Sequence, residues 1–504
     1  MLTCSCVLYG DRCDALGQPA FFILALIVPV HYRVDGRKPF HCSAYCVVRS
    51  GTADGRHQLL PAATDNHPRA GAGLNPEESD RTRLEGQIVA RAVRRGNHRR
   101  TAFSMGTPHP LYLGLVNSSP LPGAALADLL ISSLNNNGGA YHQSPAITTC
   151  EEEVIRAFAR LFEMPGADGM ILPGGSFATL QAIVLARVQA TGGPARSGFR
   201  LYTSEAAHFS VARTAAVAGL ANEDVISIPV SGRGIMDVDA LRSHIRSDRE
   251  NGKTPFAVVA TAGTTGTGAL DPLREIAALC RDETLWLHVD ACYGGAAMML
   301  ESMKSRFAGI EQADSIAIDP HKWFFIPVTA ALLLTTHRDL ARKAFATTAG
   351  SYIPTDGETD AWQRGIPTTR RSTGLAVWMA LRAHGWQTIR TAVNSNIELT
   401  RMLEALLIER GFRVLEGGEL SIACARWEPA GQSPDALDRL QPLIAREVVS
   451  SGKAWFSTTR HANCTWLRFN IVNLHTRERH VRNLVDILTT TAERMSREVS
   501  KSKT

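Results

Sequence analysis

Short apolar runs separated by longer, partly polar segments dominate the chain from residue 169 onward. The runs are MIL, RLYT, DVISIPV, FAVVATAG, LWLHVD, SIAI and TAALLL, and helical patterns such as DPLREIAALCRDE lie between them. Continuous apolar runs that alternate with helices are typical of a mostly parallel sheet covered on both faces. The pattern therefore predicts an α/β fold.

The segments on either side of these runs predict further helices. We expect one helix from Gly123 to Leu134, and another, after a polar loop, with the acids Glu151 to Glu153 in its first turn. A helix from Thr373 to His384 leads into a long connecting helix. Beyond about Asn394 the pattern becomes βαβ with amphipathic helices, which predicts a large domain over 105–393 and a small C-terminal domain over 394–504.

The first 104 residues differ from the rest of the chain. Five of the ten cysteines lie in the first fifty residues, and the apolar patch from Phe21 to Val30 is too short to span a bilayer. No basic stretch precedes this patch, which disfavours a signal peptide. Residues 47–105 are rich in Gly, Arg, His and Asp, so we expect poor order. A mis-assigned start, an upstream frame error or a divergent extension would each explain this region.

Charge and cysteine spacing exclude several classes of function. The formal net charge of the 504 residues is +6, and residues 81–100 alone hold seven arginines and one acid. The remaining chain is balanced, so no basic surface predicts nucleic-acid binding. The cysteines lack metal-ligand spacing, which predicts no metal site. We interpret them as reduced thiols of a cytoplasmic enzyme that has no membrane span.

Candidate chemistry centres on Lys322, which lies in the DPHKW segment between two apolar runs. Two strands joined by a polar loop place this lysine at a strand end. We expect His321, Trp323 and Phe324 to box in the amine, which lowers its pKa and makes it a Schiff-base candidate. The alternative is an ordinary surface lysine in a loop.

Two upstream segments favour the functional interpretation of Lys322. Asp290 ends the buried run LWLHVD, where a carboxylate is costly unless it meets a cation or a donor. The turn at Gly175 and Ser176 opens a helix, whose backbone N–H groups suit a phosphate. A phosphate turn, a ring-binding aspartate and an imine-forming lysine, in this order, indicate pyridoxal 5'-phosphate as cofactor. His208 and Thr265 also follow apolar runs, so all these residues are expected at one sheet edge.

The chain resembles the group II pyridoxal-phosphate-dependent amino acid decarboxylases. The matching stretches are HPLYLGLVNSSP, SPAITTCEEEVI, PGGSFATLQAI, SEAAHFSVARTAA, TAGTTGTGALDPL, HVDACYGG, DPHKW and LRFNIVN, in family order from His109 to about Asn473. The resemblance implies a fold-type I transferase of the aspartate aminotransferase type. Its large domain has a seven-stranded sheet, its small C-terminal domain is α+β, and its partner is a second copy in a homodimer.

The resemblance also implies roles around the cofactor. His208 would stack on the pyridine ring and help to position the substrate carboxylate, and Thr265 would contact the cofactor near Asp290. Cys292 stands where alanine is usual and would pack against the other face of the ring. Asp319 and His321 belong to the same cofactor-binding motif as Lys322.

On the substrate side, the resemblance implies that the Val116 to Ser118 corner and the Gly139 to His142 loop approach the cofactor. Arg468 would contact the substrate, although a strand arginine is often structural. Tyr352, in a long polar loop expected to be a mobile lid, would protonate the α-carbon after carbon dioxide leaves. The alternative for Tyr352 is a residue that pins the loop.

The implied reaction is decarboxylation of an L-amino acid to its amine through a Lys322 Schiff base. We expect an aromatic substrate, although Val328 and Gly139 stand where aromatic decarboxylases often carry phenylalanines. The alternatives are a decarboxylase of the glutamate, aspartate or cysteine sulfinate type, an aldehyde synthase, an aminotransferase and a cofactor-binding pseudoenzyme.

Overall fold

A computed structural model describes residues 27–32, 40–45, 106–194, 197–346 and 360–501. The chain divides into two units, residues 1–104 and 105–504. In the first unit, strands β1 (Ile27–Tyr32) and β2 (Phe40–Tyr45) pair antiparallel. The remainder of the N-terminal region expected to be poorly ordered lies outside the described residues. Within the described part of the chain, no helix has the length and apolarity needed to cross a membrane.

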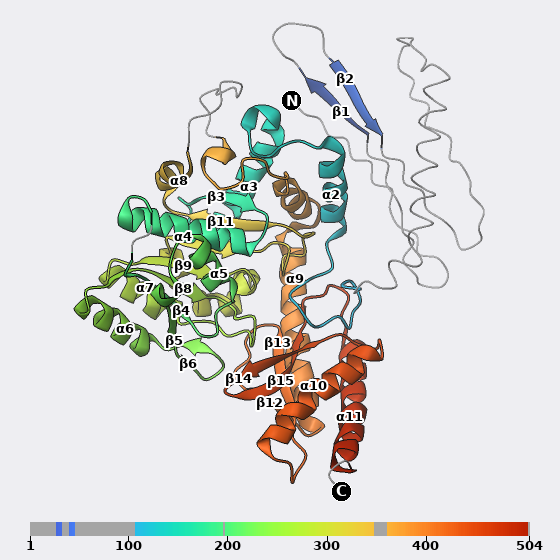
Figure 1. Ribbon diagram of the computed structural model, residues 1–504. Helices are drawn as coiled ribbons and strands as arrows, with labels where there is room; N and C mark the ends of the chain where they lie inside the picture. The colour runs from blue at the N-terminus through green and yellow to red at the C-terminus, as the bar shows by residue number, and fades with distance from the viewer. Residues whose placement is uncertain (1–26, 33–39, 46–105, 195–196, 347–359, 502–504) are drawn as a thin grey trace, which may run out of the picture. The chain divides into compact units, whose positions relative to one another are not determined.

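The second unit is built on a seven-stranded sheet whose strands follow the predicted apolar runs (Figure 1). The strands are β3 (Asp168–Leu172), β4 (Phe199–Ser204), β5 (Val225–Ile228), β8 (Thr254–Thr261), β9 (Trp286–Asp290), β10 (Ser315–Ile318) and β11 (Ala331–Thr335). Their order is β3-β11-β10-β9-β8-β4-β5. In this sheet only β11 runs antiparallel to its neighbours, so the predicted mostly parallel sheet is confirmed.

Helices cover both faces of this sheet because its strands are buried on both sides. On β8, Val258 and Ala260 pack in one apolar core, and Ala257 and Val259 pack in the other. The first core includes α3 (Pro145–Leu161), α6 (Val238–Glu250) and α7 (Leu273–Asp282). The second includes α4 (Gly175–Thr191), α5 (Ser210–Val217) and α8 (Arg338–Phe345).

Smaller elements connect these layers. Strands β6 (Val230–Ser231) and β7 (Ile235–Met236) form a separate hairpin. The short 3-10 helices are η2 (Tyr141–Gln143), η3 (Asn222–Asp224), η4 (Gly294–Met299), η5 (Glu301–Phe307), η6 (Ile310–Gln312) and η7 (Ala361–Gln363). Helix α2 (Pro122–Leu134) begins one residue before the predicted start.

Helix α3 begins earlier than predicted, and this changes the role of its acids. Pro145 opens the helix, where its missing N–H costs nothing. Glu151 therefore lies in the second turn, and the prediction that the acids occupy the first turn is wrong. Its carboxylate is buried and accepts from Arg370 Nη1 at 2.7 Å and from Ile171 N at 3.2 Å. The ion pair joins α3 to β3 and to the segment after residue 360.

The long helix α9 (Gly374–Glu409) is shared by two cores (Figure 1). Its first part contributes Val377, Ile389 and Val393 to the core of the large sheet. Its last part contributes Leu403 and Leu407 to the core of the small domain. The helix is interrupted at Gly385, whose φ of 71° lies in the left-handed region.

The small domain contains a four-stranded antiparallel sheet. Its strands are β12 (Phe412–Val414), β13 (Ile422–Trp427), β14 (Ser457–His461) and β15 (Cys464–Asn470), in the order β12-β13-β15-β14. Helices α10 (Pro434–Ser450) and α11 (Glu478–Lys501) complete it. The predicted βαβ pattern corresponds to β13, α10 and β14, with β15 inserted between the two strands.

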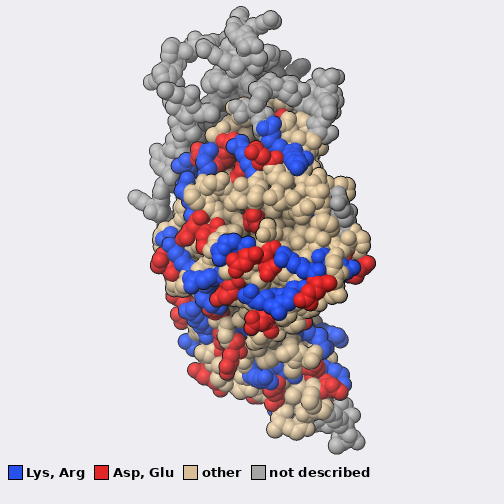
Figure 2. Space-filling view, turned by 90° about the vertical axis from the view of Figure 1, so that its left-hand side faces the viewer, with Lys and Arg blue, Asp and Glu red and all other residues tan. Residues whose placement is uncertain are grey.

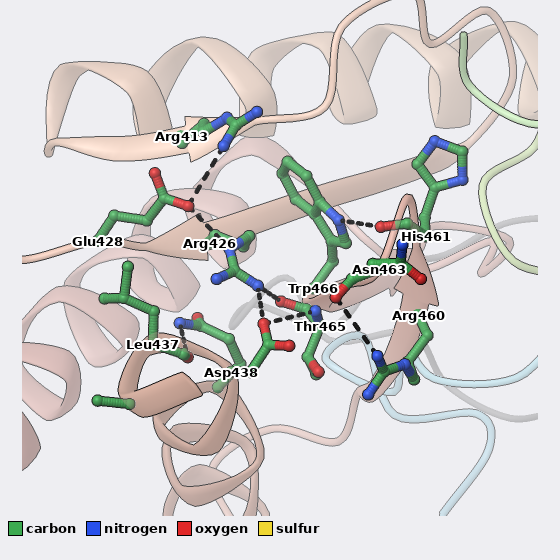
Figure 3. Close-up of polar contacts among 12 residues, drawn as sticks. Arg413, Arg426, Glu428, Leu437, Asp438, Arg460, His461, Asn463, Thr465 and Trp466 are labelled. Carbon is green, nitrogen blue, oxygen red and sulfur yellow. Dashed lines mark hydrogen bonds and ion pairs between the residues drawn. The ribbon is translucent and has the colours of Figure 1, made fainter. Parts of the chain in front are cut away.

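A buried arginine ties α10 to this sheet (Figure 3). Arg426 is 2% exposed, and it donates to Glu428 Oε1 at 2.8 Å and to Asp438 Oδ1 at 2.6 Å. It also donates to the carbonyl oxygen of Thr465, whose N–H donates back to Asp438 at 3.0 Å. This Thr465 N–H, followed by Arg426, lowers the pKa of Asp438. The network is complete within the small domain.

Figure 2 shows basic and acidic side chains interleaved on one face of the molecule. Several of the surface charges form close pairs, such as Arg249 with Glu283 at 2.6 Å and Arg306 with Glu419 at 2.6 Å. Exposed pairs of this kind contribute little to stability, about 0–1 kcal/mol each. They do, however, neutralise the surface locally.

Candidate active site

The sheet brings the predicted site residues to one edge. Asp290 is the last residue of β9, and Lys322 lies four residues beyond the end of β10. Gly175, His208 and Thr265 follow β3, β4 and β8 in the same way. Because these strands are parallel, their carboxyl ends meet at one edge.

The amine of Lys322 faces carboxylates. Its Nζ lies 2.9 Å from Asp319 Oδ2, and the side chain is 24% exposed. Burial by itself would lower the pKa of the amine, but the nearby Asp319 and Asp290 carboxylates outweigh it and raise the pKa above its usual value. The expectation of a lowered pKa is therefore wrong for the cofactor-free protein, because it considered the burial of the amine and not the charge of the carboxylates around Nζ.

The aromatic neighbours of Lys322 anchor its loop. Trp323 is fully buried, donates from Nε1 to Asn396 Oδ1 at 3.0 Å, and stacks on Tyr293. Phe324 packs on Phe158 with ring centroids 5.0 Å apart. His321 Nδ1 lies 2.7 Å from the carbonyl oxygen of Ala330. These contacts fix the backbone on both sides of the lysine.

The start of α4 approaches Cys292 and the Asp319 carboxylate more closely than a side chain at Gly175 would allow. A Cβ at Gly175 would lie 2.6 Å from Cys292 Sγ and 2.8 Å from Asp319 Oδ2. Gly174, the residue before the helix, has a φ of 136°. Gly175 and Ser176 therefore present the first N–H groups of a 17-residue helix beside Lys322, an arrangement that suits a phosphate.

Asp290 and Cys292 form a compact turn after β9. Asp290 is 8% exposed, and its Oδ1 accepts from the backbone N–H of Cys292 at 3.1 Å. Burial, together with the Asp290 carboxylate, raises the pKa of the Cys292 thiol well above its usual value. Cys292 is therefore a neutral packing residue beside the Asp290 carboxylate.

His208 lies in the same electrostatic environment. Burial lowers the pKa of its imidazole, although Asp290 acts in the opposite direction. Nδ1 lies 2.7 Å from Ser210 Oγ and accepts from the Ser210 N–H at 3.3 Å. A neutral ring that accepts at Nδ1 carries its proton on Nε2. The ring of Phe209 lies against it, with centroids 4.2 Å apart.

The segment Gly114–Ser118 connects the lysine to Arg468. Ser118 Oγ donates to the carbonyl oxygen of Lys322 at 2.5 Å, and Arg468 donates to the carbonyl oxygen of Gly114. Val116, between them, is buried. Arg468 Nε also donates to the carbonyl oxygen of Thr265 at 2.7 Å. The structure thus links Arg468 directly to Thr265, and links it to Lys322 through the segment that ends at Ser118.

Arg468 is a buried cation that can still donate a hydrogen bond. It is 4% exposed, and burial lowers the pKa of its guanidinium. Among the described residues, its Nη2 has no hydrogen-bond partner. A planar guanidinium with a free donor suits a carboxylate ligand.

Two predicted site residues have no described link to this cluster. His142 lies in the short helix η2, and in the described residues no hydrogen bond or ion pair joins it to Lys322 or Asp290. Tyr352 and the loop around it lie outside the described residues.

The sequence did not reveal what holds the loop that contains Gly139 and His142. Trp362 N donates to the carbonyl oxygen of Gly139 at 3.1 Å, and Tyr141 N donates to Asp360 Oδ1 at 2.6 Å. More than 200 residues separate these partners. No local signal could have paired them.

These residues fit pyridoxal 5'-phosphate. Lys322 offers an amine, and Asp290 offers a carboxylate at the end of a strand. Helix α4 offers an N-terminus that no side chain at Gly175 blocks. Asp319 Oδ1, which has no hydrogen-bond partner in the described residues, is a buried acceptor facing this space. A mostly parallel seven-stranded sheet with this constellation at its carboxyl edge defines a pyridoxal-phosphate enzyme of fold type I.

Comparison with known proteins agrees with this class. The model of the pyridoxal-dependent decarboxylase conserved domain matches residues 112–424. The chain therefore belongs to the group II pyridoxal-phosphate-dependent amino acid decarboxylases.

Relatives in this family differ in substrate. The aromatic-L-amino-acid decarboxylase of Bacillus atrophaeus is 30% identical over 77% of this chain and 82% of its own length. Human cysteine sulfinic acid decarboxylase is 30% identical over 71% of this chain and 77% of its own length. The crystal structure of mouse CSAD superposes with a TM-score of 0.75 at 27% identity, over 83% of this chain and 92% of that one.

The Lys322–Asp319 contact generates a prediction for the cofactor-free protein. Because the carboxylates raise the pKa of the amine, their stabilisation is present below the usual lysine pKa and is lost as pH rises through the raised value. Asp319→Asn should lower that pKa and increase the neutral fraction of Lys322. Acylation of Lys322, followed by peptide mass spectrometry at about pH 8, should accelerate about tenfold for each pKa unit lost.

Lys304 is the internal control for this experiment. Its Nζ pairs with Glu301 at 2.9 Å, on a separate exposed segment. Its labelling rate should be the same in both proteins. An unchanged rate at Lys322 in Asp319→Asn would contradict the assignment of Asp319 as the group that raises the pKa of the amine.

Proposed function

We propose that this pyridoxal-phosphate-dependent amino acid decarboxylase acts on an aromatic L-amino acid and releases the amine and carbon dioxide. The observation that supports the site most directly is the Lys322 amine, 2.9 Å from Asp319 and beside the N-terminus of α4. In this proposal Lys322 binds the cofactor covalently, and Gly175 and Ser176 hold its phosphate. Asp319 and His321 support the same end of the site.

Asp290 keeps the pyridine nitrogen of the cofactor protonated, because a carboxylate at low dielectric favours a nearby positive charge. The bound cofactor supplies the electron sink that makes loss of carbon dioxide feasible. Thr265 and Cys292 pack beside the ring, and His208 lies over it as a neutral aromatic surface.

On the substrate side, Arg468 offers its free Nη2 to the substrate carboxylate. The Val116–Ser118 corner, fixed to Lys322 through Ser118, forms the adjacent wall, and His142 is proposed to approach from its loop. Orienting the carboxylate so that its bond to the α-carbon can break is the main contribution of these residues. A proton must then reach the α-carbon. His208 Nε2 carries one, and Tyr352 stays a prediction from the sequence.

Replacement of Lys322 tests the cofactor link. Lys322→Ala should lose the borohydride-reducible cofactor adduct and all turnover, because no other described amine lies at this strand end. Asp290→Asn should keep the fold and the adduct but lower kcat on the order of a thousandfold, through loss of the pyridinium charge. A wild-type amount of adduct in Lys322→Ala would refute the assignment, as would near-normal turnover in Asp290→Asn.

Two exposed apolar side chains support an aromatic substrate. Leu115, 47% exposed, lies in the segment that joins Arg468 to Lys322, and Phe209, 64% exposed, packs against His208. Apolar surface at a ligand site favours an apolar ligand group, because its burial contributes about 25 cal/mol per Å². The similarity to the Bacillus atrophaeus aromatic-L-amino-acid decarboxylase supports the same choice.

A cation beside Phe209 favours a second candidate, an acidic substrate of the cysteine sulfinate type. The guanidinium of Arg213 lies 4.9 Å from the centre of the Phe209 ring, at the exposed start of α5. It could pair with a second acidic group on the substrate. The similarity to human cysteine sulfinic acid decarboxylase supports this alternative.

A panel of L-amino acids decides between the two candidates. Carbon dioxide and amine release should be highest with aromatic substrates, and Arg213→Gln should leave their KM unchanged. A preference for glutamate, aspartate or cysteine sulfinate, with KM raised about tenfold in Arg213→Gln, would favour the acidic class instead. Release of aldehyde, ammonia and hydrogen peroxide would indicate an aldehyde synthase. Formation of a keto acid would indicate an aminotransferase, and absence of turnover with every amino acid would indicate a pseudoenzyme.

We also propose a homodimer. Phe177 and Val217 on the α4 and α5 side, together with Phe209 and Val328 near the site, are 40–69% exposed apolar side chains. Exposed apolar side chains of this size favour a protein interface, and closed two-fold pairing is the commonest form. Sedimentation should give twice the chain mass of 54.7 kDa. A fully active monomer would contradict the proposal.

A further inference from the structure

Arg233 occupies an unusual position for a hairpin residue. It lies at the tip of the β6–β7 hairpin, between Gly232 (φ 52°) and Gly234 (φ 104°). Hairpin tips are normally solvated, yet Arg233 is only 4% exposed. Its side chain is therefore inserted into the protein and must find partners for its N–H groups.

Those partners belong to two different parts of the structure. Nε donates to the carbonyl oxygen of Thr267 at 2.8 Å, in the turn after β8. Nη2 donates to the carbonyl oxygen of Ile422 at 2.6 Å, and Nη1 donates to those of Leu415 and Glu416, all in the small domain. One guanidinium thus joins the large domain, through this turn, to the small domain.

The turn at Thr264–Gly268 is held at three successive carbonyl oxygens. Arg468 Nε donates to Thr265 at 2.7 Å, Cys424 Sγ donates to Gly266 at 3.6 Å, and Arg233 Nε donates to Thr267. Thr267 Oγ1 donates in return to the carbonyl oxygen of Arg233 at 2.6 Å. The position of Thr265 is therefore fixed from both sides by buried arginines.

Hydrogen-bond geometry, more than charge pairing, explains the placement of Arg233. Its nearest carboxylate oxygen, Glu404 Oε1, is 3.9 Å away. Burial raises the pKa of Glu404 to about 7, and Arg233 offsets only part of this effect. The bonds at Nε, Nη1 and Nη2 need a planar fork, which a lysine cannot reproduce.

We propose that Arg233 is a positioning residue for the active site. It fixes the Thr264–Gly268 turn against the small domain and thereby sets the places of Thr265, beside the cofactor, and Arg468, at the substrate carboxylate. Arg233 reaches the site only through the turn. This inference rests on the roles proposed above for Thr265 and Arg468.

The test compares two buried arginines. Arg233→Met keeps most of the side-chain volume and removes every donor, and Arg233→Lys keeps the charge without the fork. Arg426→Met is the matched control, because Arg426 is equally buried but its network is confined to the small domain. For each protein we would measure the melting temperature, the pyridoxal 5'-phosphate dissociation constant by titration of the cofactor-free form, and KM and kcat.

Arg233→Met and Arg426→Met should both lower the melting temperature. Only Arg233→Met should raise the cofactor dissociation constant and the substrate KM, each by about tenfold, with kcat at saturation changed by less than about threefold. Arg233→Lys should show the same changes in direction, because it cannot span Thr267 and Ile422 together. If Arg233→Met does not fold, Arg233→Lys decides the question.

Equal effects of Arg233→Met and Arg426→Met on cofactor and substrate binding would overturn the proposal, as would normal binding in both Arg233 variants. Arg468→Met separates this failure from failure of the proposed function. A normal KM in Arg468→Met would remove the role of Arg468 itself. The proposed role of Arg233 would then rest on Thr265, and the cofactor dissociation constant alone would test it.

Discussion

The parallel arrangement of the central strands is the constraint on which the active site depends. It directs the carboxyl ends of β3, β4, β8, β9 and β10 to one edge, where loops carry polar groups that the apolar strands cannot. At this edge Lys322 lies among acidic side chains that would repel one another without it. In the proposed function the amine has two environments, one beside Asp319 and one bound to the cofactor. Its neighbours must tolerate both.

Much of this arrangement could be predicted from the sequence. The seven apolar runs became the seven strands, because buried parallel strands have an apolar pattern that few other elements share. The predicted grouping of Gly175, His208, Thr265, Asp290 and Lys322 followed from the same rule about strand ends. Local patterns thus sufficed wherever the chemistry lies directly after a strand.

The errors have a common physical origin in long-range contacts. Trp323 and Phe324 point into the core, where Trp323 donates to Asn396 and Phe324 packs on Phe158. Glu151 pairs with Arg370 from the second turn of its helix. A local sequence pattern shows none of these partners. Arg233 lies in an ordinary Gly-Arg-Gly turn, and nothing in the sequence indicated that its side chain is buried.

The sharing of α9 by two apolar cores has a consequence for how the protein unfolds. Val377, Ile389 and Val393 pack with the large sheet, and Leu403 and Leu407 pack with the small one, on one helix. Melting of the small domain strips the contacts from the second half of α9, and a helix end without tertiary contacts is only marginally stable in water. Fraying can then travel back along the helix only until it reaches Val393 and Ile389, which stay packed with the large sheet. The boundary between the two cooperative unfolding units thus lies between Val393 and Leu403, within a helix and not in a linker.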